Sequence, residues 1–76
     1  MSLIIDLSER EKNLLFKICE QKTTKQISYE MGLRKRTVEK LRTDLMRKTD
    51  SRSMIGLVIY AIENNVYKLN QPVINI

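Results

Sequence analysis

Two helix-start signatures near the beginning of the chain constrain its fold more than any other feature. In each, a hydroxyl side chain precedes a longer polar side chain by three residues: Ser8 precedes Glu11, and Thr23 precedes Gln26. At this spacing each side chain can bond to the other residue's backbone N–H, which makes a capping box at a helix start. The chain has only two glycines and one proline, which favours helices over a turn-rich sheet. The sequence therefore predicts an all-α fold.

The first two helices follow from these signatures. The first is expected to begin after Ser8 and to end near Gln21. Its apolar face consists of Leu14, Leu15 and Ile18. The second is expected from Thr23 to Met31, because Gly32 then offers the left-handed conformation that ends a helix.

A third helix is expected from about Arg34 to Thr49. Val38, Leu41 and Leu45 recur in it at three- and four-residue spacing and form a buried stripe. The spacing of Ser28 and Gly32 before this stripe is what two tightly crossing helices need, with a small residue at the contact and a glycine in the turn. This pattern predicts a helix-turn-helix whose second helix is presented outward.

The net charge of +5 lies entirely within this third helix. Seven of the fourteen basic residues fall between Arg34 and Lys48, opposed only by Glu39 and Asp44, and the rest of the chain is neutral. The helix face opposite the buried stripe carries Arg36, Lys40, Thr43 and Arg47. A solvated charged face is the simplest interpretation, but the neutrality of the remaining chain favours a nucleic-acid footprint.

Three cations crowd the first turn of this helix. Arg34, Lys35 and Arg36 lie where the helix dipole is already positive, which disfavours them unless an anion completes the site. A helix N-terminus with added arginines suits a phosphate group. We therefore assign these residues, together with Arg47, to phosphate contacts.

Size and composition exclude several other classes of protein. A chain of 76 residues forms one domain, and domains this short bury only about 60% of their unfolded surface, so a partner subunit would help. The absence of histidine removes the usual general base and zinc ligand, so neither enzymatic activity nor a cofactor is expected. Cys19 has no partner for a disulfide and is expected to be a buried apolar residue. No secretory signal or membrane span is evident, which favours a cytoplasmic protein.

The segments "LSERE" and "KQISYEMGLRKRTVEKLRTDLMRK" resemble the LuxR-type (GerE-like) DNA-binding domain. This domain is the effector part of NarL/FixJ-type response regulators in two-component systems. The resemblance covers about residues 7–66 and implies four helices, with the helix-turn-helix in the second and third and dimerisation through the fourth. It also implies that the chain is the C-terminal part of a longer regulator.

The resemblance assigns roles to individual residues. It places Glu39, Lys40 and Thr43 at base-facing positions, and Lys25 and Thr37 at phosphate-contacting positions. The family's usual serine cap of the recognition helix is Arg34 here, a change that typically costs about 1 kcal/mol of helix stability. The family commonly has glycine at the end of the first helix, where this chain has Gln21.

The fourth helix is expected from Met54 to about Asn65, capped by Asp50 or Ser51. One apolar stripe, aligned with the family's core positions, comprises Met54, Leu57, Val58 and Ala61. A second stripe comprises Ile55, Ile59, Ile62 and Val66. An exposed isoleucine stripe needs a cover, either the apolar chain ends "MSLII" and "QPVINI" or, as we prefer, a second copy of the chain. Whether the two ends pack on each other or on the domain is left open.

Together these features predict a transcription regulator that binds double-stranded DNA as a dimer, with its third helix in the major groove. RNA polymerase is a further candidate partner. One alternative is a sigma-factor region-4-like module that binds promoters together with polymerase. Another is a protein-interaction module that dimerises without reading DNA.

Overall fold

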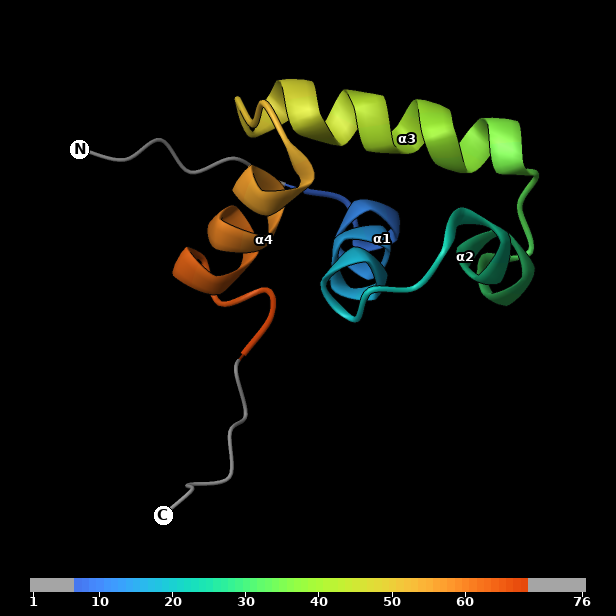
Figure 1. Ribbon diagram of the computed structural model, residues 1–76, viewed down its shortest axis with the longest axis horizontal. Helices are drawn as coiled ribbons and strands as arrows, with labels where there is room; N and C mark the ends of the chain where they lie inside the picture. Colours follow the sequence, from blue (N-terminus) through green and yellow to red (C-terminus); the bar gives the residue numbers. More distant parts are fainter. Residues whose placement is uncertain (1–6, 69–76) are drawn as a thin grey trace, which may run out of the picture.

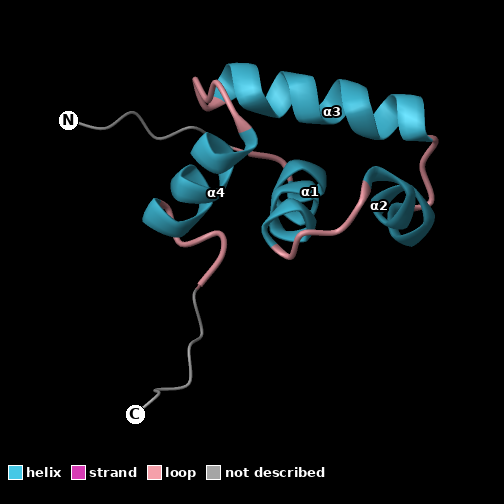
Figure 2. Cartoon of the chain, in the orientation of Figure 1, coloured by secondary structure: helices cyan, strands magenta, loops and turns pink. Residues whose placement is uncertain are grey.

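Four α-helices and no strand form the regular structure of residues 7–68, which are the residues that the computed structural model describes (Figure 2). The helices are α1 (Glu9–Cys19), α2 (Thr24–Met31), α3 (Lys35–Lys48) and α4 (Met54–Glu63). The predicted all-α class is thereby confirmed. The apolar ends of the chain, whose packing was left open, lie outside the described residues.

Both predicted capping boxes are present. Ser8 Oγ accepts a hydrogen bond from the Glu11 backbone N–H at 3.0 Å, and the Ser8 N–H donates to Glu11 Oε1 at 2.9 Å. The corresponding bonds between Thr23 and Gln26 measure 3.1 and 2.8 Å. Each box satisfies two backbone groups that a helix start leaves without partners, which explains why α1 and α2 begin where the sequence predicts.

The ends of the first two helices depend on left-handed residues. Gly32 has φ +67° and ends α2, and the Leu33 N–H donates to the Ser28 carbonyl at 3.0 Å. Gln21 has φ +63°, so α1 ends at Cys19, two residues before the predicted end near Gln21. A left-handed residue breaks the run of right-handed dihedral angles, so the helix cannot continue through it.

The helix α4 begins at Met54 as predicted, but its cap and its end differ from the prediction. Its cap is Ser53, whose Oγ accepts from the Gly56 N–H at 3.1 Å, and neither Asp50 nor Ser51 has this role. Asp50 has φ +55° and belongs to the turn that ends α3, whereas an N-cap residue needs an extended conformation. At the other end α4 stops at Glu63, before Asn65, which is also left-handed. The bounds of α3 differ from the prediction by one residue at each end.

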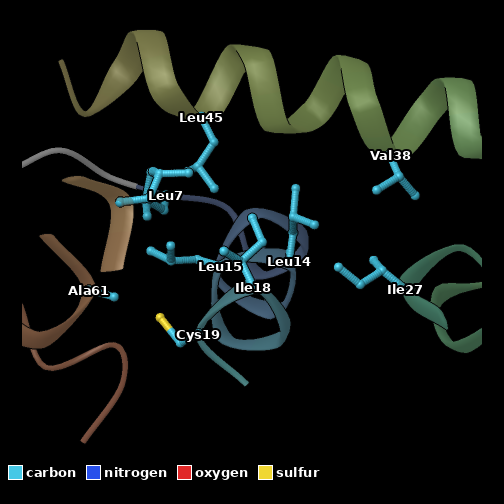
Figure 3. Packing of buried hydrophobic residues seen from close by; sticks show 10 residues of the cluster. Leu7, Leu14, Leu15, Ile18, Cys19, Ile27, Val38, Leu45 and Ala61 are labelled. Carbon is cyan, nitrogen blue, oxygen red and sulfur yellow. The ribbon is translucent and has the colours of Figure 1, made fainter. Parts of the chain in front are cut away.

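The helix α1 lies at the centre and packs against both α3 and α4, while α2 packs against α3 (Figure 1). Leu14 and Leu15 of α1 are fully buried and meet Leu45 of α3 and Leu57 of α4 in one apolar cluster. Figure 3 shows Leu7, Ile18, Cys19 and Ala61 around them. Burial of this kind is the main stabilising term of a small domain.

The predicted core stripes are confirmed except at Met54, and two of their other residues are only half-buried. Val38 and Leu45 of α3 are buried, and Leu41 is half-buried. In α4, Leu57 and Ala61 are buried and Val58 is half-buried, whereas Met54 is exposed at the first turn and does not belong to the core. Cys19 is buried as expected, and this burial raises the pKa of its thiol. No helix in residues 7–68 has the length and apolar character to cross a membrane.

Ion pairs join α1 to α2 and to α3. Glu30 of α2 accepts from Lys17 at 2.8 Å and from Lys22 at 2.9 Å. Glu11 of α1 accepts from Lys48 of α3 at 2.7 Å. The Glu11 side chain is buried, so this second pair lies in a less hydrated setting than ordinary surface pairs.

Candidate nucleic-acid interface

The α2–turn–α3 unit holds one face of α3 outward. Ile27 of α2 and Val38 of α3 are both buried, and in Figure 3 Val38 points inward from α3 while Ile27 points from α2 toward Leu14 of α1. The turn between them is closed by the left-handed Gly32 and by a hydrogen bond from Ser28 Oγ to the Leu33 carbonyl. Because α3 runs along the outer edge of the helical assembly, its opposite face points away from the core (Figure 1).

The three residues predicted to face bases lie on this outward face. Glu39, Lys40 and Thr43 are all exposed. Arg36 and Arg47, predicted to contact phosphates, are exposed on the same helix. The geometry thus gathers side chains of both predicted kinds on one surface, which we call the outward face of α3.

The first turn of α3 has the features of an anion site. Arg34 is the N-cap residue, with an extended backbone (φ −77°, ψ 152°), and its side chain makes no capping hydrogen bond. Lys35 and Arg36 follow it, and all three side chains are exposed. None of the three forms a salt bridge with any residue between 7 and 68. Unbonded N–H groups, the helix dipole and three unpaired cations therefore coincide here.

The other two predicted phosphate-contacting residues, Lys25 and Thr37, lie in the first turns of α2 and α3. Lys25 is exposed in the first turn of α2, and Thr37 is half-buried in α3. Arg42 Nη1 donates to Thr24 Oγ1 at 3.4 Å, which joins the middle of α3 to the start of α2. This bond places the turn that carries Lys25 beside α3.

The basic segment divides into three groups by what each cation contacts. Three cations, at the first turn of α3, have no ion pair in the described part of the chain. Two other cations bind residues of other helices: Arg42 binds Thr24 and Lys48 binds Glu11. The remaining two are Lys40 and Arg47, which share Asp44 at 3.8 and 2.8 Å.

The sequence did not lead us to predict these partners of the α3 cations, for two different reasons. Arg42 and Lys48 bind residues that are far away along the chain, so no local pattern indicates them. Asp44 lies four residues after Lys40 and three before Arg47, a spacing at which helical side chains meet. That signal was present in the sequence. The Arg47 guanidinium, which donates to Asp44, holds the pKa of this carboxyl below its usual value.

The second stripe of α4 is partly exposed. Ile55 is 72% exposed and Ile59 is 49% exposed, whereas Ile62 is half-buried. Val66 lies beyond the end of α4 and packs against the core cluster, so it does not extend the helical stripe. An apolar groove between α1 and α4 is lined by Ile18, Cys19, Gln21, Met54, Ile55, Val58 and Ile59.

Comparison with known proteins agrees with this arrangement. The family model described as "Bacterial regulatory proteins, luxR family" (GerE) matches residues 6–61. The chain belongs to the LuxR family. The match spans α1, α2 and α3 and most of α4, so it includes the whole helix-turn-helix. Searches of curated proteins and of solved structures found no match. A LuxR-family domain indicates DNA binding and regulation of transcription, and such domains are not typically enzymes.

Proposed function

We propose that this LuxR-family domain regulates transcription by binding double-stranded DNA as a dimer, with α3 in the major groove. The observation that carries the proposal is the outward face of α3. It presents exposed charged and polar side chains along the helix, and at the helix start three cations form no salt bridge within residues 7–68. A groove of duplex DNA offers phosphates along its edges and base edges on its floor, and this arrangement suits both.

Within this proposal the contacts divide by position. The cations nearest the helix start, together with Lys25, Thr37 and Arg47, bind phosphates and set the position of the helix on the duplex. Lys40, Thr43 and Glu39 face base edges. A lysine in this position suits guanine acceptors, and a glutamate suits the amino group of cytosine.

The proposed dimer contact lies on α4. Ile55 and Ile59 are exposed apolar side chains on one helix face, next to the apolar groove against α1. Apolar residues at the centre of an interface are typical of homodimers. Two copies related by a two-fold axis would present two α3 helices, each to its own half-site. Ile62 and Val66, which are half-buried, would contribute less of their surface.

The larger context is also part of the proposal. The resemblance to effector domains of response regulators supports a place at the C-terminal end of a longer, cytoplasmic regulator that acts with RNA polymerase. The LuxR-family match favours this regulator over the sigma-factor alternative. The exposed isoleucines also support a second candidate function, a protein-interaction module that dimerises without reading DNA, because they suit apolar association.

Salt dependence separates the two candidates. Selection of bound duplexes from a random DNA pool should enrich a sequence with two related half-sites, and affinity for it should fall steeply as salt rises. Dimerisation with no enrichment and no salt-dependent binding to any duplex would contradict the proposal and favour the interaction module.

A further inference from the structure

One carboxylate at the edge of the outward face of α3 binds two of the cations assigned to DNA. Asp44 Oδ1 accepts a hydrogen bond from Arg47 Nη2 at 2.8 Å, and Asp44 Oδ2 lies 3.8 Å from Lys40 Nζ. The Asp44 side chain is 27% exposed, against 76% for Lys40 and 69% for Arg47. The carboxylate side chain is therefore much less exposed than the two cations that it pairs with.

These pairs make the outward face electrostatically uneven. Asp44 offsets one of the two positive charges of Lys40 and Arg47. The first turn, by contrast, holds Arg34, Lys35 and Arg36 with no ion pair among residues 7–68. Phosphate attraction is therefore strongest at the helix start and reduced where Lys40 and Arg47 lie.

We propose that Asp44 is a specificity-determining residue of the DNA interface, which weakens the phosphate contact that Arg47 offers to any duplex and holds Lys40 back from phosphates, so that Lys40 faces base edges. This inference rests on the proposed function. In this role Asp44 is a positioning residue, because it acts through the two cations and needs no contact with DNA.

The effect differs between matched and unmatched DNA. Binding to unmatched DNA consists almost entirely of cation–phosphate contacts. Arg47 can make such a contact only by leaving Asp44 or by bringing a phosphate close to the carboxylate, and both are unfavourable. Lys40 Nζ forms an ion pair with Asp44 at 3.8 Å, and its N–H donors stay free to meet a guanine acceptor without breaking that pair. The carboxylate therefore weakens unmatched binding more than matched binding.

The test is Asp44→Asn, which keeps the shape of the side chain and removes its charge. The full chain is titrated at several salt concentrations against two duplexes, one recovered by selection from a random pool and one of scrambled sequence. Affinity for the scrambled duplex should rise roughly two- to fivefold, the range that a partly exposed ion pair allows. Its salt slope should steepen by up to about one unit for each cation released. The ratio of matched to scrambled affinity should fall.

Two further variants make the result specific. Glu20→Gln removes an exposed carboxylate at the end of α1, outside α2 and α3, and should leave the salt slope unchanged. In an Arg47→Ala background, Asp44→Asn should give a smaller gain in affinity for the scrambled duplex, because one of the two released cations is missing. An Asp44→Asn variant that behaves like Glu20→Gln would overturn the inference, as would an equal gain on both duplexes. A wild-type domain without salt-dependent binding to either duplex would contradict the proposed function itself.

Discussion

Lys48 Nζ lies 2.7 Å from Glu11 Oε2 and joins the last turn of α3 to the first turn of α1. Glu11 is also the second member of the capping box with Ser8, so one carboxylate both starts α1 and fixes α3 against it. The Lys48 ammonium, assisted by the Ser8 N–H, holds the pKa of the Glu11 carboxyl below its usual value. The position of the outward face of α3 thus depends on a contact at the back of that helix.

This pair predicts a pH-dependent loss of stability. Lys48→Met should lower the free energy of unfolding by about 1–2 kcal/mol at neutral pH, because it leaves a buried carboxylate without its cation. A carboxyl whose pKa is lowered by folding contributes stability above its unfolded pKa of roughly 4.3 and loses it as pH falls through the folded pKa. The difference between variant and wild type should therefore shrink in acid, as measured by urea unfolding at several pH values. Lys12→Met, which breaks the exposed pair with Glu9, is the control. It should lower the free energy of unfolding by less than about 0.5 kcal/mol at every pH measured.

The two glycines should respond to alanine with opposite signs. Gly32 has φ +67°, and a Cβ there would meet no atom within 4 Å, so Gly32→Ala should cost about 1 kcal/mol from backbone strain alone. Gly56 lies inside α4, where an added Cβ would be 3.4 Å from Ser51 Cβ, an ordinary contact. Gly56→Ala should therefore stabilise by roughly 0.5–1 kcal/mol. Thermal and urea unfolding of both variants measure the change in the free energy of unfolding. Changes of the same sign would contradict the different backbone conformations given to the two glycines.

Arg34→Ser should separate stability from DNA affinity. Arg34 already has the extended backbone of an N-cap but makes no side-chain bond, so serine should stabilise α3 by about 1 kcal/mol. The same change removes one cation from the first turn, so it should weaken DNA binding and reduce the salt slope by about one unit per subunit. Arg34→Ala removes the cation without adding a cap and should show the second effect alone. A serine variant that binds DNA as tightly as wild type would remove Arg34 from the proposed phosphate site.

Arg36 and Lys40 should differ in how their loss depends on sequence. Lys40→Ala should relax the preference at one base-pair position, at a cost of roughly 1–3 kcal/mol there. Arg36→Ala, nearer the helix start, should weaken binding to all duplexes about equally and lower the salt slope by about one unit for each lost contact. Titration of both variants against matched and mismatched duplexes compares them. Equal, sequence-independent losses would mean that α3 contacts the DNA backbone without reading bases.

Ile59→Asp should give a folded monomer. The side chain is half exposed on α4, and an aspartate at the centre of an apolar contact would have to be desolvated on association. Sedimentation equilibrium should report the loss of the dimer while circular dichroism reports unchanged helix content. Tyr29→Asp, at a highly exposed position on α2, is the matched control and should leave the oligomeric state unchanged. An Ile59→Asp dimer would place the interface elsewhere, and an unfolded variant would make Ile59 part of the core.

The features that the sequence predicted well are local. A capping box joins residues three positions apart, and Gly32 marks the end of α2 by its own backbone preference, so neither depends on the rest of the fold. The cap of α4 was missed because Asp50 takes part in the turn that ends α3 and has a left-handed backbone, which an N-cap residue does not have. The partners of Arg42 and Lys48 were missed because they lie on other helices, far away along the chain.

The residues of the outward face of α3 were predicted from helical periodicity together with the family resemblance. The sequence could count the positive charges of this segment, but it could not indicate which of them bind within the protein. That division is a property of the packed helices. The roles of individual residues toward DNA remain predictions, which the variants above test.

Three helices are followed by a left-handed residue that carries a side chain: Gln21, Asp50 and Asn65. A Cβ in this conformation costs up to about 1 kcal/mol relative to glycine, least for asparagine and aspartate. Domains of this size are only marginally stable, so glycine at one of these turns would raise the free energy of unfolding by a useful amount. A descendant with glycine at Gln21 would tolerate more destabilising substitutions on the outward face of α3 before unfolding. The freedom of such a regulator to evolve new DNA targets would then be set partly by a turn that lies outside that face.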